Sequence, residues 1–207
     1  MITLEASSLG EIWIKAMRII MRTGTDIKDE DQKLREICNF YMTITHIDES
    51  DPILQKYADK KRIELMKEKY ATCGLVGDYK VDYGSRVFNN HGIDQLDWAI
   101  KRIKNKPETK SATFSLHEPG EDMLPCLSLL DFKLRNGQVD MTAVYRSQNT
   151  FWSMPGNLLA LHQMQKDVAH GVRCEIGKVE LVVASAHIYH KDFETVQYIL
   201  NETEKND

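Results

Sequence analysis

A short segment between a predicted strand and a predicted helix carries most of the polar groups that suggest chemistry. Residues 145–157 contain Arg146 and Ser147 side by side, followed by Asn149 and Asn157. An arginine next to a hydroxyl group binds an oxyanion well, and side-chain amides recognise a flat polar ring. The segment therefore predicts a binding site for a small anionic molecule that carries such a ring.

Cys126 is the candidate nucleophile, and it follows Pro125 in an apolar predicted strand. A reactive cysteine needs positive charge close to its thiolate. The dipeptide Asn136-Gly137 is a strong hairpin signal, so the next strand is expected to return beside the first and to place Arg146 near Cys126. The alternative from the sequence alone is a cysteine that only packs in the core.

Further candidates lie at both ends of the sequence. His187 and Tyr189 are two residues apart at the end of a predicted strand, so they share a face and are suited to hold a sugar hydroxyl. Arg22 projects from a polar turn after a predicted helix, and Glu36 stands among apolar neighbours. Each has a simpler alternative. His187 and Tyr189 could be a half-buried polar pair with no ligand, Arg22 a surface arginine, and Glu36 a surface salt-bridge partner.

The segments that must position these residues show both helical and strand patterns. Residues 26–33 are predicted to be a charged link, residues 34–44 a helix with an extended end, and residues 71–92 mostly loop. The pattern indicates one α+β domain over residues 1–207. Predicted helices span 8–22, 51–70, 94–106, 157–169 and 191–201, and predicted strands span 111–116, 124–134, 138–146 and 177–186.

Composition narrows the class of protein. The 207 residues have a net charge of −4 and a pI near 6.0, which does not favour nucleic acid as a partner. There is no apolar run long enough for a membrane span and no recognisable leader, so we expect a cytoplasmic protein. The four cysteines form no close pair and the histidines show no metal-ligand spacing, so neither a disulfide framework nor a metal site is expected.

Taken together, these motifs resemble the thymidylate synthase family, which includes the pyrimidine-nucleotide hydroxymethylases. The resemblance covers roughly residues 10–200 and keeps the family's motif order, with compactness most similar to the short archaeal-type members. The motifs that carry it are Arg22-Thr23-Gly24-Thr25, Tyr83-Gly84, Pro125-Cys126, Arg146-Ser147 with Phe151 and Pro155-x-Asn157, and Ala186-His187-Ile188-Tyr189.

The resemblance implies a thymidylate synthase-like fold, a twisted mixed sheet with flanking helices, and a homodimer that packs sheet against sheet. It also implies one-carbon transfer to C5 of a uracil nucleotide, from dUMP to dTMP, with 5,10-methylenetetrahydrofolate as donor and no metal. Cys126 would add to C6 of the base. Asn157 would donate to O4 and accept from N3–H, the pattern of uracil rather than cytosine. Glu36 would be the carboxylate for proton transfer on the O4 side.

The remaining implied roles concern substrate binding. Arg22, Arg146 and Ser147 would hold the 5′-phosphate, and Arg146 would also favour the Cys126 thiolate. His187 and Tyr189 would hold the ribose hydroxyl.

Several positions depart from the family pattern. Leu127 stands where the family has a histidine, and Lys110-Ser111 replaces an arginine pair that reaches across the dimer to the phosphate. Asn149 replaces the aspartate that contacts folate, and no family-like tail follows the last helix. These departures leave two alternatives open, a 5-hydroxymethylase acting on (d)UMP or (d)CMP and a non-catalytic nucleotide-binding homologue.

Overall fold

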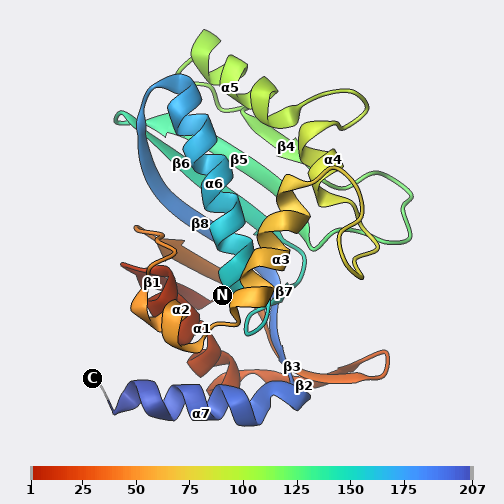
Figure 1. The fold of residues 1–207 in the computed structure, drawn as a ribbon, viewed down its shortest axis with the longest axis vertical. Helices are drawn as coiled ribbons and strands as arrows, with labels where there is room; N and C mark the ends of the chain where they lie inside the picture. The colour runs from red at the N-terminus through yellow and green to blue at the C-terminus, as the bar shows by residue number, and fades with distance from the viewer. Residues whose placement is uncertain (1, 206–207) are drawn as a thin grey trace.

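A twisted, mixed sheet runs through the structure, a computed structural model that describes residues 2–205 (Figure 1). The strand order is β1-β3-β8-β6-β5-β4, with β2 paired to β3 and β7 paired to β8. This arrangement confirms the predicted α+β class with a mixed sheet. The strands are β1 (Ile2–Ala6), β2 (Thr25–Asp29), β3 (Gln32–Ile44), β4 (Thr113–Ser115), β5 (Leu127–Arg135), β6 (Gln138–Tyr145), β7 (Gln148–Asn149) and β8 (Glu175–Tyr189).

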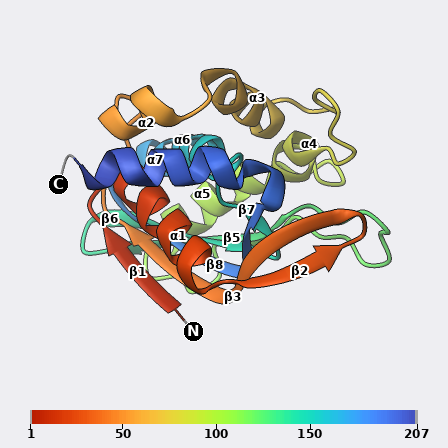
Figure 2. The same ribbon diagram turned by 90° about the horizontal axis from the view of Figure 1, so that it is seen from below.

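The helices gather on one side of the sheet, and no helix of residues 2–205 covers the opposite sheet face (Figure 2). Within residues 2–205, none of the helices has the length and apolarity required to cross a bilayer. The helices are α1 (Leu9–Thr23), α2 (Pro52–Tyr57), α3 (Lys60–Ala71), α4 (Tyr83–Phe88), α5 (Gln95–Asn105), α6 (Met154–Val172) and α7 (Phe193–Glu204), with a short 3₁₀ turn η1 (His190–Asp192) before α7.

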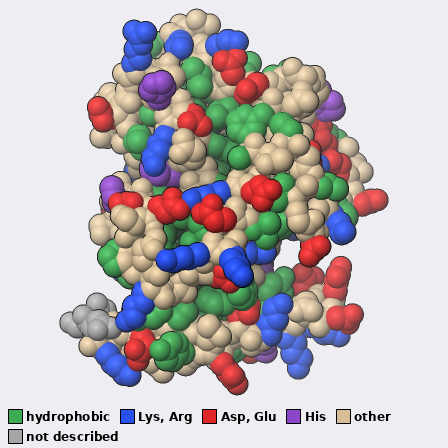
Figure 3. Space-filling view, in the orientation of Figure 1, with side chains coloured by type: hydrophobic (Ala, Val, Ile, Leu, Met, Phe, Trp, Pro, Cys, Tyr) green, Lys and Arg blue, Asp and Glu red, His purple; other side chains and the backbone are tan. Residues whose placement is uncertain are grey.

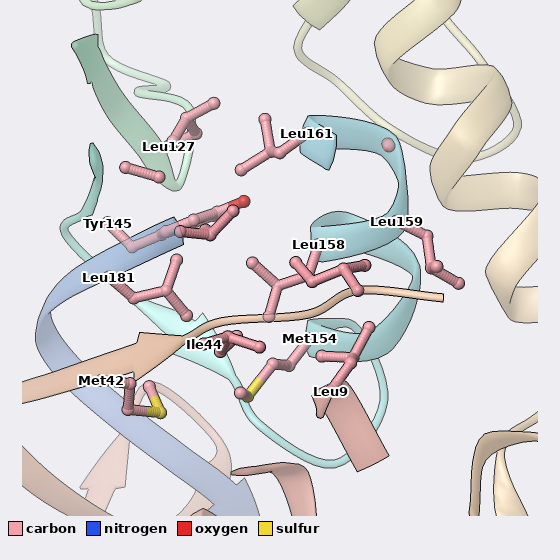
Figure 4. Close-up of a cluster of buried hydrophobic side chains, with 14 of the residues drawn as sticks. Leu9, Met42, Ile44, Leu127, Tyr145, Met154, Leu158, Leu159, Leu161 and Leu181 are labelled. Carbon is pink, nitrogen blue, oxygen red and sulfur yellow. The ribbon is translucent and has the colours of Figure 1, made fainter. Parts of the chain in front are cut away.

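The core lies between α6 and the sheet. Met154, Leu158 and Leu161 from α6 meet Ile44 from β3 and Leu181 from β8, and all five side chains are buried (Figure 4). Burying such side chains removes apolar surface from water, the main driving force of folding. The core therefore fixes α6, including its N-terminal turn, against the sheet.

The predicted hairpin at Asn136-Gly137 is confirmed. Both residues have positive φ angles, 50° and 78°, as a tight turn between β5 and β6 requires. The register pairs Leu127 with Tyr145, and the Arg146 N–H donates to the Cys126 carbonyl over 2.9 Å. The turn thus brings Arg146 beside Cys126, as the sequence predicted.

The prediction for residues 26–44 is wrong, because the charged link and the expected helix are the β2–β3 hairpin. Leu34, Ile37 and Phe40 are buried at intervals of three residues, which mimics a helical period. Asn39, whose φ of 57° interrupts the normal alternation of the strand, accounts for the interval from Ile37 to Phe40. On β8, opposite Asn39, the buried residues also switch from one side of the strand to the other, between Val183 and Ala186. Both strands therefore bend at this point.

Two further predictions require correction. Residues 51–70 form two helices rather than one, because Asp59 caps a new helix by accepting from the Arg62 N–H. The segment 71–92, predicted as loop, contains the short helix α4, which Asp82 caps. The remaining predicted helices and strands are present with shifted ends.

Helices α3 and α6 approach each other at Gly156. A Cβ atom at this position would lie 2.7 Å from the Met66 Cβ and 3.0 Å from the Ile63 Cα. Both are closer than ordinary van der Waals contact, and neither atom is the end of a flexible side chain. Glycine therefore allows α3 to rest directly on the first turn of α6.

We predict that Gly156→Ala destabilises the protein by about 1–3 kcal/mol, because the added methyl group must push α3 and α6 apart. Intrinsic helix propensity alone favours alanine by about 1 kcal/mol, so the two effects oppose each other. Urea unfolding measures the difference. Gln163→Ala, on the exposed side of α6, is the matched control and should change stability little. A Gly156→Ala variant as stable as the wild type would show that the helices have room to spare.

Candidate active site

The main chain around Cys126 is held from two sides. The Cys126 N–H donates to the Tyr83 hydroxyl over 2.8 Å, and its carbonyl accepts from Arg146. The Cys126 side chain is partly exposed and follows directly on the loop that precedes β5. Leu127, the next residue, is fully buried. The nucleophile predicted from the sequence therefore stands at the end of a rigid strand and is open to a ligand.

The Arg146 guanidinium lies over the residues before the cysteine. Its Nε donates to the Pro125 carbonyl over 3.0 Å and its Nη2 to the Leu124 carbonyl over 2.7 Å. Arg146 is otherwise exposed, so its remaining N–H groups face solvent. Because these donors lie beside Cys126, the arrangement suits both an anion and a thiolate.

The predicted sugar-binding pair lies on β8, next to β7. The rings of His187 and Tyr189 meet edge to face with centroids 5.2 Å apart. The His187 Nδ1 is 3.4 Å from the Ser147 hydroxyl, and the register places His187 opposite Asn149. Burial lowers the pKa of His187, so its ring is neutral at physiological pH. The structure thus brings Ser147, Asn149, His187 and Tyr189 together.

Glu36 lies on the other side of β8 from β7, opposite His187. Its Oε2 accepts from the Ser185 hydroxyl over 2.5 Å, and its Oε1 lies 3.6 Å from the Cys38 sulfur. Ser185 stands where the family motif has an acid, so the serine supplies a donor to Glu36 instead. Within residues 2–205 no hydrogen bond joins Glu36 to Cys126.

Arg22 and the Lys110-Ser111 pair lie farther out. Arg22 is exposed in the last turn of α1, and nothing in the described part of the chain ties it to Arg146 or Ser147 by a hydrogen bond. Lys110 is exposed ahead of β4, and the Ser111 hydroxyl accepts from Arg102 over 2.9 Å. These residues remain predictions as phosphate ligands.

Asn157 occupies the first turn of α6 and is only 4% exposed. Its Oδ1 accepts from the Lys69 Nζ over 3.2 Å, and its Nδ2 donates to the Gln148 Oε1 over 3.2 Å. Lys69 is likewise 4% exposed. Neither Lys69 nor Gln148 was predicted from the sequence as a site residue.

Lys69 is a buried cation surrounded by aromatic rings. Its Nζ lies 4.5 Å from the ring centroid of Tyr70, 4.8 Å from that of Tyr79 and 4.3 Å from that of Tyr83. Burial lowers the pKa of Lys69 to about 7, although the nearby Cys126 acts in the opposite direction and raises it. The only signal in the sequence is its helical spacing from Met66, which also faces α6.

A groove of about 490 Å³ opens next to these residues, between the start of α3 and the ends of β7 and β8. Its floor includes Asn149, whose Oδ1 accepts from the Trp152 N–H over 2.9 Å. The Arg62 Nε is buried and lacks a hydrogen-bond partner among the described residues. The lining residues are Asp59, Lys61, Arg62, Leu65, Asn149, Trp152, Tyr189 and Lys191.

Charges of both signs are mixed over the molecular face shown in Figure 3, and no extended basic patch appears on it. An anion would therefore have to be bound by a few local donors. Within residues 2–205, no three histidine, cysteine or acidic side chains cluster in a way that would hold a metal ion.

Comparison with known proteins identifies the same family as the sequence motifs. The family model described as thymidylate synthase matches residues 13–207. The chain is 32% identical to a "Putative thymidylate synthase" of Methanothermobacter thermautotrophicus, over 96% of this chain and 98% of the relative. It is 29% identical to proteins of the same description from Methanosarcina barkeri, over 95% and 93% of the two chains, and from Methanosarcina acetivorans, over 95% and 94%. These matches favour an enzyme over the non-catalytic alternative.

The lowered pKa of Lys69 predicts a pH-dependent stability. Between pH 7 and the ordinary lysine value of 10.5, the unfolded chain binds a proton that the folded chain has lost. The free energy of unfolding therefore rises with pH in this window, by up to about 1.4 kcal/mol per pH unit from this group. In Lys69→Met the folded and unfolded chains no longer differ in proton binding at this position. We expect this variant to be more stable than the wild type near pH 7, and the difference in stability to shrink toward pH 9.

Urea unfolding at a series of pH values tests this prediction. Lys67→Met is the matched control, since Lys67 lies on the same helix and pairs with Glu49 and Glu64. Burial acts to lower the Lys67 pKa, but the two carboxylates outweigh it and raise the pKa. The Lys67→Met variant should therefore show the same dependence of stability on pH as the wild type in this window. Parallel stability curves for Lys69→Met and the wild type would contradict the prediction.

Proposed function

The chain belongs to the thymidylate synthase family, and we propose on that premise that it converts dUMP to dTMP through a covalent adduct of Cys126. The observation that carries the proposal is the position of Cys126, partly exposed and held between the Tyr83 hydroxyl and Arg146. Family membership supports one-carbon transfer to a uracil nucleotide in general. The finer assignments below are our inference.

The first step follows from the chemistry of the thiolate. The Cys126 sulfur bonds to C6 of the base, and the C5–C6 electron pair moves toward O4 to form an enolate. C5 would then bond to the methylene carbon of the donor as a carbon–nitrogen bond of the donor breaks and the C5 proton leaves. A hydride from the donor would complete the methyl group as the sulfur departs from C6. Arg146 would support the step with its positive charge, since its guanidinium donates to the Pro125 and Leu124 carbonyls directly before Cys126.

Asn157 is the residue we assign to the base. Its Nδ2 retains one hydrogen beyond the bond to Gln148, and its Oδ1 retains one lone pair beyond the bond from Lys69. These groups match O4 and N3–H of uracil. The donor at O4 also stabilises the enolate as it forms. Glu36 would handle the proton on the O4 side through an intervening water, since no hydrogen bond among the described residues joins it to Cys126.

We assign the binding of the phosphate and of the sugar to residues around β7. Arg146 and Ser147 would bind the 5′-phosphate, with Arg22 contributing from the end of α1. His187 and Tyr189 would hold the ribose hydroxyl, since they lie beside Ser147 and project from the same strand. A neutral His187 can both donate to and accept from a hydroxyl group.

We propose that the groove beside Asn149 and Trp152 binds 5,10-methylenetetrahydrofolate, which supplies the one-carbon unit. The residues present fit such a molecule. Trp152 offers an aromatic surface for a flat ring, and the unpartnered Arg62 Nε needs an acceptor. Lys61 and Lys191 line the same groove and suit the carboxylates of a folate tail. A volume of about 490 Å³ lies in the range of small-molecule sites.

We further propose that residues 1–207 act as one domain, that the protein is a cytoplasmic homodimer, and that it binds neither nucleic acid nor membrane. One sheet contains strands from both ends of the chain, which supports a single domain. The sheet face without helices carries Val182 at 37% exposure, which supports a second copy on that face.

We predict that 5-fluoro-dUMP together with methylenetetrahydrofolate gives a stable covalent adduct at Cys126, because fluorine at C5 does not leave as the proton does. Intact mass followed by peptide mapping measures the adduct. Cys126→Ser should lower adduct formation by about 10³-fold or more, since a serine hydroxyl is a far weaker nucleophile than a thiolate.

Cys174→Ser is the matched control and should retain the adduct, since Cys174 lies after α6 and away from Arg146. Nucleotide binding without any mass increase at Cys126 would contradict the covalent mechanism. Product analysis from dUMP then separates a methyl from a hydroxymethyl group, which distinguishes the synthase from the hydroxymethylase.

A further inference from the structure

Three buried side chains form a series of hydrogen bonds with a fixed direction, here called the amide series (Lys69, Asn157 and Gln148). Lys69 Nζ donates to Asn157 Oδ1, Asn157 Nδ2 donates to Gln148 Oε1, and Gln148 Nε2 donates to the Asn149 carbonyl over 3.3 Å. All three side chains are at most 4% exposed. Water therefore does not replace any of these bonds.

The two groups at the ends of the amide series each have only one possible hydrogen-bonding role. An ammonium group only donates, and a main-chain carbonyl only accepts. The two amides between them must therefore place their oxygens toward Lys69 and their nitrogens toward the Asn149 carbonyl. Turning the Asn157 amide by half a rotation would set its NH₂ group against the ammonium and its oxygen against the Gln148 oxygen. Each amide alone has no such preference, so Lys69 supplies the direction.

A purely structural role explains Lys69 poorly. No carboxylate of residues 2–205 forms an ion pair with it, and burial of an amine without such a partner is unfavourable. The groups that face it are Arg62 and Tyr70 from α3, Tyr79 from the loop, Tyr83 from α4 and Cys126 ahead of β5. Met66, one turn earlier on the same helix, shows that an apolar side chain fits against α6. A lysine at this position suggests a function that outweighs its effect on stability.

We propose that Lys69 is a specificity-determining residue, which holds the Asn157 amide in the orientation that accepts uracil and prevents the rotation that cytosine requires. The inference rests on the proposed function, since it takes Asn157 to face the base. Uracil presents an acceptor at O4 and a donor at N3–H. Cytosine presents a donor at N4 and an acceptor at N3, so it needs the Asn157 oxygen and nitrogen exchanged. Lys69 acts through Asn157 and is a positioning residue.

The test is the ratio of the dissociation constants for dUMP and dCMP, measured by calorimetry near pH 6, where Lys69 is protonated. We expect the wild type to prefer dUMP by about 100-fold or more, because mispaired buried polar groups are strongly unfavourable. Lys69→Gln should reduce this ratio by about tenfold or more, mainly by tighter dCMP binding. A glutamine amide both donates and accepts, so it no longer fixes the direction of Asn157.

Two further variants keep the test decisive. Lys69→Met removes the donor altogether and should also reduce the ratio, and its packing matches that of Met66. Lys67→Gln, two residues along on the same helix and outside the amide series, should leave the ratio unchanged. Thermal unfolding of each variant establishes that it is folded.

A folded Lys69→Gln or Lys69→Met variant with a ratio within about twofold of the wild type would overturn the role of Lys69 and leave the proposed function intact. A wild type that binds neither nucleotide, or that prefers dCMP, would overturn the proposed function and the inference together. A merely structural lysine would change the stability of the fold and not the ratio, which is how the two roles differ in this experiment.

Discussion

The contact between a buried amine on α3 and the first turn of α6 determines the geometry of the candidate site. Gly156 lets the helices approach closely enough for Lys69 to reach Asn157. The same amine lies on the ring of Tyr83, whose hydroxyl holds the main chain of Cys126. One helix–helix contact therefore links the residue assigned to the base with the nucleophile. Because Lys69, Asn157 and Tyr83 are buried, a small shift of α3 would disturb both the residue assigned to the base and the support of the nucleophile.

The sheet supplies the other half of the site. The tight turn between β5 and β6 brings Arg146 beside Cys126, and the bend at Asn39 gives β3 and β8 an end that departs from the rest of the sheet. His187 and Tyr189 lie on this end, next to the segment that leads into α6. Residues far apart in the sequence thus meet where strands end and a helix begins, which is where α/β proteins commonly bind ligands.

Local signals were enough to predict part of this arrangement. The turn residues Asn136-Gly137 predicted the hairpin, and hence the proximity of Cys126 and Arg146, because that turn has few conformations. The bend at Asn39 was not predictable, since its effect on burial imitates a helical period. Lys69 was not predictable either. It stands in a strongly charged helix, and only the tertiary contact with α6 distinguishes a buried lysine from a solvated one.

The central claim is that the α3–α6 contact and the end of the sheet together bind a uracil nucleotide beside Cys126. A crystal structure of the protein with dUMP tests it most directly. The account predicts the base edge at Asn157, C6 within bonding reach of the Cys126 sulfur, and the phosphate at Arg146 and Ser147. A phosphate bound at Lys69, or a base edge turned away from Asn157, would contradict the account.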